Sequence, residues 1–307
     1  SPSSINTTDD VQPADTIGGT LTSHLSTNGG ICPVENDSLV ITFVAPPQVF
    51  AGIDQDYCDN EPVSLSGTLS GTASSASWTS TGTGGFNPSN NLLNTFYFPS
   101  TLDLTNGSVE LILTSSTDFG CLADKDTVLI SYKPAPVADF SNSSVCLGEN
   151  TTFTDLSTIT TGTINSWQYD FGDMGTSIAN NPIHTYTSSG SFNVTLIAGS
   201  DNNCYDTITR TIFVNPEPIA LFNNNYACEN EVIYFNDISF LASGDIVQWN
   251  WDFNNGAGTS NITNPIFTFG SAGQYPVMLE VTSDSGCVSS VTNNVDVLAG
   301  PSADFTV

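Results

Sequence analysis

Short runs of alternating polar and apolar residues recur along the chain, separated by clusters of Gly, Asn, Ser and Pro. Residues 109–113, 191–197 and 211–214 show this period of two most clearly. Such alternation places apolar side chains on one face of a half-buried β-strand. No segment of about ten residues carries the i, i+3, i+4, i+7 apolar stripe of an amphipathic helix. The pattern predicts an all-β chain of short strands.

Two long segments of the chain repeat each other. When Cys146 is placed on Cys228, the tryptophan, aspartate and glycine residues that follow coincide. After one inserted residue, Cys204 falls on Cys287. Agreement in order over about 80 residues indicates two homologous domains.

A second, related pair precedes the first. When Cys32 is placed on Cys121, residues 37–43 align with residues 126–132. The earlier unit has no counterpart for Cys58, which opens the later unit. We therefore expect the chain to start with the C-terminal half of a domain.

Short proline-rich joints at 45–47, 133–136, 215–218 and 300–301 separate the repeats. Proline fixes φ and restricts the residue before it, so joints of this length form stiff tethers. The predicted fold is a row of immunoglobulin-like β-sandwiches in an elongated rod. The predicted domains are the half-repeat 1–46, a divergent repeat 47–135, two homologous repeats 136–217 and 218–301, and the start of a further repeat at 302–307.

Seven cysteines follow the same division. Each complete repeat holds one cysteine near its start and one before its closing strand, which predicts intradomain disulfides. On a loop-entropy estimate each contributes about 4 kcal/mol. The predicted pairs are Cys58–Cys121, Cys146–Cys204 and Cys228–Cys287, with Cys32 bonded to a cysteine of the missing half-repeat. The alternative is reduced, buried thiols; two His and the absence of Cys-x-x-Cys argue against metal ligation.

Charge excludes several classes of function. The 307 residues include 3 Lys and Arg against 31 Asp and Glu, a formal net charge of −28. So few basic side chains cannot form a nucleic-acid footprint, and the charge repels anionic membranes. No apolar run reaches the roughly 20 residues that span a bilayer. Evenly spaced cysteines and scarce lysine indicate an extracellular protein.

Three linked motifs carry a family resemblance. Residues 167–173 (WQYDFGD), 181–186 (NPIHTY) and 190–196 (GSFNVTL) resemble the PKD (polycystic kidney disease) domain pattern. The resemblance implies an immunoglobulin-like sandwich that acts as an extracellular spacer or adhesive module. Its fold residues here are Trp167, Asp170, Phe171, Gly172, Asp173, Pro182, His184, Tyr186, Gly190, Trp249, Asp252 and Phe253. The last repeat departs from the pattern, with Asn254-Asn255 in place of Gly-Asp and Phe267 in place of His.

The motif residues have structural roles that can be stated in advance. Trp167 and Trp249 are expected to be core tryptophans that pack near a disulfide. Asp170 is expected to accept backbone N–H groups in a turn that Gly172 permits. Tyr186 is expected to be buried with its hydroxyl hydrogen-bonded.

Few residues suggest chemistry. His184 has no nucleophile motif beside it, so we predict no enzyme and no cofactor. Hard cations prefer carboxylate oxygens in loops, which makes structural calcium the remaining possibility; solvent-exposed turn residues are the alternative. The candidate carboxylates are Asp54, Asp56, Asp201 and Asp284. Ser38, Thr127 and Thr207 each lie between Asp and an apolar residue, which resembles Bacteroidota O-glycosylation sites; ordinary strand composition is the alternative.

The repeat at 47–135 lacks the PKD motif and is similar to sandwich repeats found beside PKD domains in Bacteroidota surface proteins. Arrays of this mixture resemble the SprB-like adhesins of gliding bacteria, which use type IX secretion. We therefore expect a non-catalytic segment of a giant adhesin outside the cell. Its expected partners are neighbouring repeats, unidentified surface or polysaccharide ligands and the outer-membrane secretion and motility machinery, without nucleic acid or membrane insertion. The alternatives are spacer domains of a secreted hydrolase, and a carbohydrate-binding array that uses Tyr57, Phe86 or Tyr97.

Overall fold

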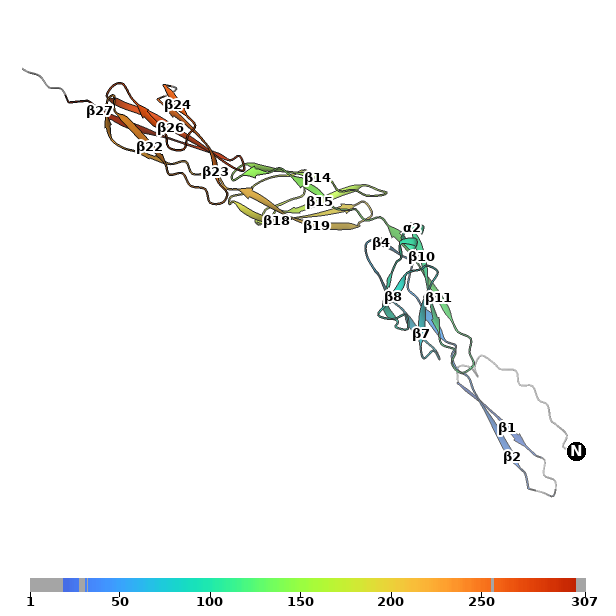
Figure 1. Ribbon diagram of the computed structural model, residues 1–307. Helices are drawn as coiled ribbons and strands as arrows, with labels where there is room; N and C mark the ends of the chain where they lie inside the picture. The colour runs from blue at the N-terminus through green and yellow to red at the C-terminus, as the bar shows by residue number, and fades with distance from the viewer. Residues whose placement is uncertain (1–18, 28–30, 32, 255–256, 302–307) are drawn as a thin grey trace, which may run out of the picture. The chain divides into compact units, whose positions relative to one another are not determined.

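The computed structural model describes residues 19–27, 31, 33–254 and 257–301, and nearly all of its regular elements are β-strands (Figure 1). The prediction of an all-β chain is therefore confirmed. The chain divides into two compact units, Ser1–Pro134 and Ala135–Val307. Cys32 and residues 302–307, to which two predictions refer, lie outside the described residues.

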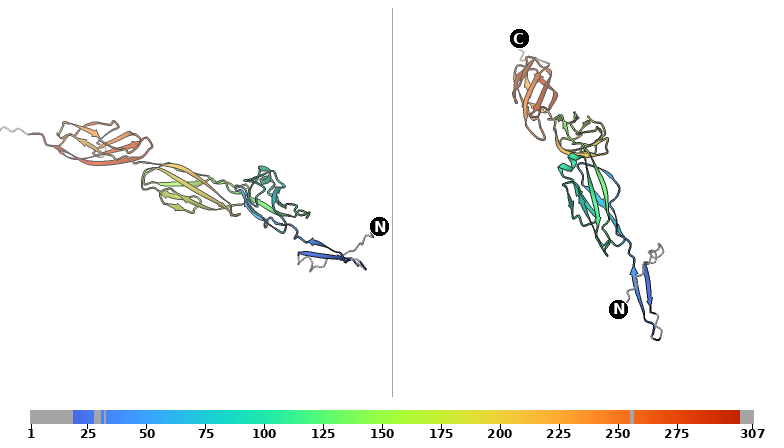
Figure 2. Two further views of the ribbon diagram at one scale, coloured as in Figure 1. Left: turned by 90° about the horizontal axis from the view of Figure 1, so that it is seen from below. Right: turned by 90° about the vertical axis from the view of Figure 1, so that its right-hand side faces the viewer.

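The first unit begins with an antiparallel hairpin of β1 (Thr20–Ser26) and β2 (Asn36–Thr42). Both further views show it as a two-stranded ribbon (Figure 2, blue). Leu39 and Val40 of β2 are more than half exposed. In the alignment of Cys32 with Cys121, this hairpin corresponds to the last two strands of the sandwich that follows. That the hairpin is half of a sandwich stays a prediction.

The rest of the first unit is a β-sandwich, called sandwich 2 below. One sheet has the order β4 (Gln55–Cys58), β11 (Lys125–Lys133), β10 (Ser108–Ser115), β7 (Ala76–Ser80). The facing strands are β5 (Val63–Ser66), β9 (Asn94–Phe98) and β8 (Gly85–Asn87), with the pair β3 (Gln48–Phe50) and β6 (Thr68–Ser70). Trp78, Tyr97 and Leu111 are fully buried in its core. A short helix, α2 (Thr101–Asn106), precedes β10.

The second unit starts with sandwich 3. Its larger sheet has the order β13 (Val145–Cys146), β19 (Tyr205–Asn215), β18 (Gly190–Ser200), β15 (Ile164–Asp170), β16 (Thr176–Ser177). Its smaller sheet contains β12 (Phe140–Asn142), β14 (Asn150–Asp155) and β17 (Ile183–Thr185). Phe140, Phe153 and Tyr169 form much of the core between them.

Sandwich 4 repeats this topology strand for strand. The larger sheet runs β21 (Ala227–Cys228), β27 (Val288–Leu298), β26 (Gly273–Ser283), β23 (Ile246–Phe253), β24 (Gly258–Ser260). The smaller sheet runs β20 (Phe222–Asn224), β22 (Val232–Asp237), β25 (Ile266–Thr268). Phe222, Phe235 and Trp251 occupy its core, which matches the homology expected from the repeat.

One shared feature of the three sandwiches determines where their cysteines lie. The short strand near the start of each sandwich pairs in parallel with the closing strand, and only with its last residues. The cysteine that ends the short strand lies opposite the last residue of the closing strand. The pairs are Cys58 with Lys133, Cys146 with Asn215, and Cys228 with Leu298. Below, Cys58, Cys146 and Cys228 are called first cysteines, and Cys121, Cys204 and Cys287 second cysteines.

Candidate functional site

The two cysteines of one sandwich lie at opposite ends of its closing strand. Cys146 is opposite Asn215, the last residue of β19, whereas Cys204 immediately precedes Tyr205, the first. The strand has 11 residues. At about 3.3 Å per residue its ends are about 33 Å apart. A disulfide requires Cα atoms roughly 4.4–6.8 Å apart, so the pair within one sandwich cannot form.

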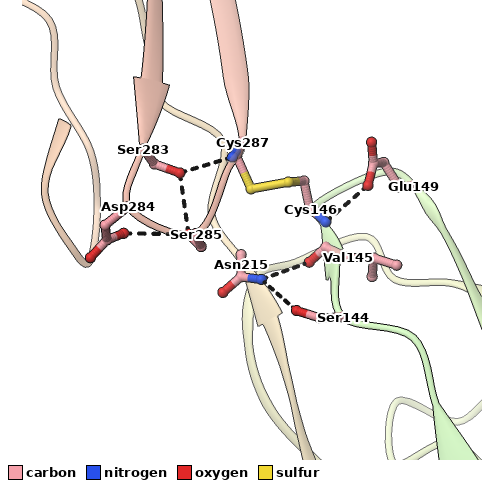
Figure 3. The surroundings of a disulfide bond; sticks show 9 residues. All are labelled: Ser144, Val145, Cys146, Glu149, Asn215, Ser283, Asp284, Ser285 and Cys287. Atoms are coloured by element: carbon pink, nitrogen blue, oxygen red, sulfur yellow. Dashed lines mark hydrogen bonds between the residues drawn. A yellow bond between two sulfur atoms is a disulfide. The ribbon is translucent and has the colours of Figure 1, made fainter. Parts of the chain in front are cut away.

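The structure instead places a disulfide across the joint between sandwiches 3 and 4 (Figure 3). It joins Cys146 to Cys287, with an S–S distance of 2.00 Å and a Cα–Cα distance of 5.7 Å. Cys146 ends β13, and Cys287 lies in the turn between β26 and β27. The bond spans a sequence separation of 141 residues and includes the proline-rich joint in the loop that it closes. We call it the staple.

The staple corrects the predicted disulfides. Cys146–Cys204 and Cys228–Cys287 are wrong, because Cys146 bonds Cys287 and Cys228 is a free thiol. Cys58–Cys121 is also wrong, because Cys121 is a free thiol. Cys58 and Cys204 are each disulfide-bonded. The sequence placed each second cysteine correctly before the closing strand, but gave no sign that the first cysteine pairs with that strand's far end.

Hydrogen bonds fix Cys146 at the exit of sandwich 3. Its N–H donates to Glu149 Oε2 at 3.1 Å, and the Glu149 N–H donates back to the Cys146 carbonyl at 3.1 Å. The Asn215 side-chain amide donates to the Val145 carbonyl at 3.1 Å (Figure 3). Leu147 N–H donates to the Asn215 carbonyl at 2.8 Å. The cysteine is thereby held against the last residue before the proline-rich joint.

Cys287 is fixed by the tight turn that enters β27. The Ser283 N–H donates to the Cys287 carbonyl at 2.8 Å, and the Cys287 N–H donates to Ser283 Oγ at 3.0 Å. Gly286 adopts φ 85°, a left-handed conformation that glycine tolerates without strain. Cys287 is 1% exposed. Backbone and side-chain hydrogen bonds therefore hold both ends of the staple in place.

A shallow, mainly polar hollow of about 290 Å³ lies at this joint. Its lining residues come from both sandwiches: Phe213, Asn215, Pro216, Ser243, Gly244, Asp284 and Ser285. Asp284, a calcium candidate, accepts a long hydrogen bond of 3.5 Å from Ser285 Oγ. The hollow holds one carboxylate and no catalytic pair.

The other calcium candidates are used in local bonds. Asp201 accepts from Thr163 N at 3.2 Å and Thr163 Oγ1 at 3.0 Å, and Asp54 accepts from Leu129 N at 2.9 Å. Asp56 lies 3.5 Å from the Lys133 ammonium. Within the described ranges, no group of three or more His, Cys, Asp or Glu is placed to hold a metal ion. The four carboxylates are not brought together, and calcium stays a prediction.

The PKD motif residues of sandwich 3 form a fold element. Asp170 Oδ1 accepts from Gly172 N at 2.9 Å, and Gly172 has φ 80°, as expected of this turn. His184 Nε2 lies 2.8 Å from Asp173 Oδ2, and its ring stacks on Phe171 at 4.2 Å. Burial opposes ionisation of Asp173, but hydrogen bonds from His184 and the Gly175 N–H outweigh it and lower the pKa of that carboxyl. The imidazole is thus a packed structural group.

Tyr186 also takes its expected position. It is 1% exposed, and its hydroxyl donates to the Phe171 carbonyl at 3.1 Å. In sandwich 4, Phe267 replaces the histidine and stacks on Phe253 at 4.4 Å. The stack therefore survives the substitution, whereas the imidazole–carboxylate bond has no equivalent on a phenyl ring.

The two motif tryptophans differ from their expected role. Trp167 and Trp249 are only partly buried at the margin of each core, and each donates its indole N–H to an aspartate at 2.7 Å, Asp155 and Asp237 respectively. Trp167 pairs with Ala198, which pairs with Asp206 near the start of β19. It is therefore at the opposite end of the sandwich from Cys146. The expected packing of the two tryptophans near a disulfide stays a prediction. The fully buried side chains are Tyr169 and Trp251, two residues later.

Aromatic residues suggested for carbohydrate binding do not form an exposed platform. Tyr97 is fully buried, and Phe86 packs on it with ring centroids 5.1 Å apart. The Tyr57 hydroxyl is engaged with the backbone of Ser64. Carbohydrate binding by these side chains would require them to be exposed, and Tyr97 is not.

A buried carboxylate in sandwich 2 was not among the residues predicted from the sequence. Asp103, 1% exposed, accepts from the Tyr97 hydroxyl at 2.8 Å, Ser100 N at 2.8 Å, and the N–H groups of Thr83 and Gly84 at 3.0 Å each. Burial opposes its ionisation, but the donors, led by the Ser100 N–H, lower its pKa. The signal was the capping box Ser-x-x-Asp at residues 100–103, which begins α2.

The three candidate glycosylation residues are exposed. Ser38, Thr127 and Thr207 lie on β2, β11 and β19. The aspartates before Thr127 and Thr207 have a structural use: Asp126 accepts from Ala51 N at 2.7 Å and Asp206 from Ala138 N at 2.8 Å. These bonds pin the entering chain to the closing strand and explain the recurring aspartate; glycosylation stays a prediction.

Comparison with known proteins decides the family. The family profile of the PKD domain matches residues 133–214 and 215–298, more than half of the chain. The chain belongs to the PKD domain family. Its PKD domains are tandem, and they are the segments that hold the staple. Among the residues that the structure describes, no helix is long and apolar enough to cross a membrane.

Two curated relatives are Vibrio proteins. The chain is 33% identical over 137 residues to the pre-pro-metalloprotease PrtV of Vibrio cholerae, covering 44% of this chain and 15% of that protein. It is 36% identical over 84 residues to a microbial collagenase of Vibrio alginolyticus, covering 27% of this chain and 10% of the collagenase. A crystal structure of the PKD1 domain of PrtV is 36% identical and covers 26% of this chain and 96% of that domain, with a TM-score of 0.25. The chain thus matches a small part of each curated relative.

Proposed function

We propose that this chain is a non-catalytic, load-bearing spacer in an extracellular adhesive protein. The observation that carries the proposal is the staple between the two PKD sandwiches. A covalent bond across a joint restricts the bending and extension of that joint. This restriction suits a spacer that is under tension better than one that must be flexible. The PKD motif residues act in packing, which leaves no chemical step to assign.

The staple changes the path that a pulling force takes. Tension that enters sandwich 3 reaches Cys146, crosses the sulfurs to Cys287 and leaves through β27. Residues 147–286 lie inside the closed loop and are bypassed. Without the bond, the same residues would be exposed to load and could extend by roughly 3.6 Å each. The staple therefore limits how far the pair can lengthen.

An extracellular location follows from the same chemistry. Disulfides persist in oxidising compartments and are rare where thiols are kept reduced. The net charge of −28 makes separate molecules of this kind repel one another at distances up to about 8 Å at physiological salt. The mixture of repeats favours one specific form of this proposal. In that form the parent protein is an adhesin of a gliding Bacteroidota cell that uses type IX secretion and has partners in the outer membrane.

A second candidate is supported by the matched relatives. PKD domains of a metalloprotease and a collagenase are similar to this chain, so the sandwiches could be spacers of a secreted hydrolase. The parent gene separates the two readings. Many repeats without a hydrolase domain favour the adhesin, and one catalytic domain with a few repeats favours the enzyme.

The proposal is tested in the source organism by attachment under flow. Cells that lack the gene should detach from a surface at lower shear than wild-type cells, and the intact gene should restore attachment. Complementation with Cys146→Ser/Cys287→Ser should restore display but not full resistance to shear. Unchanged attachment of the deletion strain, with loss of a secreted hydrolase activity, would support the second candidate instead.

A further inference from the structure

The setting of the bonded Cys146 is repeated at the other first cysteines. In each sandwich, the residue that follows the first cysteine donates its N–H to the carbonyl of the last residue of the closing strand. The third residue after the cysteine is a glutamate, and its N–H donates to the carbonyl of the cysteine. The first of these distances is 2.9 Å for Asp59 to Lys133, 2.8 Å for Leu147 to Asn215 and 2.9 Å for Glu229 to Leu298. The second is 3.2 Å for Glu61, 3.1 Å for Glu149 and 3.1 Å for Glu231.

The side-chain contact that orients Cys146 is also present at Cys228. Glu231 Oε2 accepts from the Cys228 N–H at 3.0 Å, as Glu149 Oε2 accepts from the Cys146 N–H at 3.1 Å. Cys228 is half-buried, as Cys146 is. The two cysteines thus have the same backbone, the same register and the same exposure class, but only Cys146 is bonded in the described chain.

The second cysteines share a setting of their own. Each follows directly on a residue with a left-handed backbone, in the turn before the closing strand: Gly120 with φ 79°, Asn203 with φ 58° and Gly286 with φ 85°. This turn lies at the end of the sandwich where the closing strand begins. A sandwich therefore has its first cysteine at the end where the closing strand ends, called the exit, and its second cysteine at the end where that strand begins, called the entrance.

We propose that the staple is one link of a repeating series, in which the first cysteine of each sandwich bonds the second cysteine of the sandwich that follows it. Cys228 is then the donor of the link to a next sandwich, and Cys121 the receiver of a link from a preceding one. The partner is a sandwich of this same kind, because its entrance turn offers a cysteine in the geometry of Cys287. The series is an interaction surface at each joint, beyond the single staple and independent of what the parent protein adheres to.

Formation of each link is an oxidation that an external disulfide supplies. The Cys228 thiol, as thiolate, attacks a disulfide of a small molecule or of a thiol–disulfide oxidoreductase and releases one reduced thiol. The partner cysteine then attacks the mixed disulfide, forms the link and releases the second reduced thiol. Two protein thiols become one disulfide as one external disulfide becomes two thiols. The negative charge of the chain does not prevent this second attack, because both cysteines belong to the same chain and meet at one joint.

The experiment uses the full chain and an extended chain in which a second copy of residues 216–300 follows Leu298. This position corresponds to the place of residue 216 after Asn215 at the existing joint. Both are folded with oxidised glutathione, alkylated and digested without reduction by an acid-specific protease, because the sequence holds only 3 Lys and Arg. The disulfide peptides are identified by mass spectrometry. The matched control carries serine at the second cysteine of the added copy.

Cys228 should be alkylated in the 307-residue chain and in the control, and should be at least tenfold less alkylated in the extended chain. There it should appear linked to the second cysteine of the added copy, with Cys146–Cys287 retained. A Cys228 that stays alkylatable, or that bonds Cys287, would overturn the proposal. The natural full-length protein, purified without reductant, gives an independent reading if the added copy does not fold: Cys228 bonded to a second cysteine supports the series, and any other state of Cys228 refutes it. None of these outcomes bears on whether the parent is an adhesin.

Discussion

Cys146 lies opposite Asn215 at the end of β19, a full strand length from Cys204, the partner that its own domain offers. This relationship follows from a strand of two residues that pairs in parallel with the exit of the sandwich. It directs the sulfur away from its own sandwich and toward the next. The consequences can be measured one at a time.

Loss of the staple should weaken the second unit. We expect Cys146→Ser/Cys287→Ser to lower its free energy of unfolding by about 2–4 kcal/mol, because the cross-link no longer restricts the unfolded chain. Urea unfolding of oxidised protein, followed by tryptophan fluorescence, measures the change. Cys228→Ser is the matched control, since Cys228 is a free thiol in this chain, and should change stability by less than about 0.5 kcal/mol. Equal effects of the two variants would argue against the staple.

Asp103 should be a main support of sandwich 2. Asp103→Asn removes the charge of a carboxylate that accepts from the Tyr97 hydroxyl and from the N–H groups of Ser100 and the 83–84 loop. It should cost about 2–3 kcal/mol of unfolding free energy. Denaturant unfolding of the chain at pH 7, read from a probe in the first unit, checks this. Glu110→Gln, on an exposed position of β10, is the control and should be near neutral.

The same carboxyl should make sandwich 2 sensitive to acid. The folded pKa of Asp103 lies below its unfolded value, so its stabilisation is complete above the unfolded pKa and is lost as pH falls through the folded pKa. The free energy of unfolding of the wild type should therefore fall as the pH drops below about 4, the ordinary pKa of a free Asp. Asp103→Asn should flatten this dependence. A variant curve parallel to the wild type would show that another group carries it.

Sandwich 4 provides the guide to replacing His184. His184→Phe keeps the ring stack on Phe171, as Phe267 does on Phe253, and should cost no more than about 1 kcal/mol. His184→Ala removes the stack and should cost about 2–3 kcal/mol. Thermal unfolding of the two variants gives the comparison. If His184→Phe is as damaging as His184→Ala, the bond to Asp173 rather than the stack holds this corner.

The sequence predicted much of this architecture for identifiable reasons. Period-two alternation gave the strands, and the motif around Asp170 and Tyr186 gave a turn and a buried hydroxyl, because these depend on local chemistry. The disulfide partners were not predictable in this way. The disulfide partner depends on which end of β19 the short strand β13 pairs with. This contact is distant in the sequence, and the residue types of Val145 and Cys146 do not predict it. The prediction of a core position for Trp167 was wrong for a similar reason. Its indole N–H donates to Asp155, so the side chain stays at the margin of the core, which Tyr169 fills instead.

Single-molecule stretching of the full chain shows whether the staple carries a pulling force past residues 147–286. The chain is held through handles placed at residues 135 and 301, with and without reductant. We expect that oxidised protein does not release residues 147–286. Reduction, or Cys146→Ser/Cys287→Ser, should add about 500 Å of contour length for the 141-residue separation. Equal contour length in the oxidised and reduced states would contradict it.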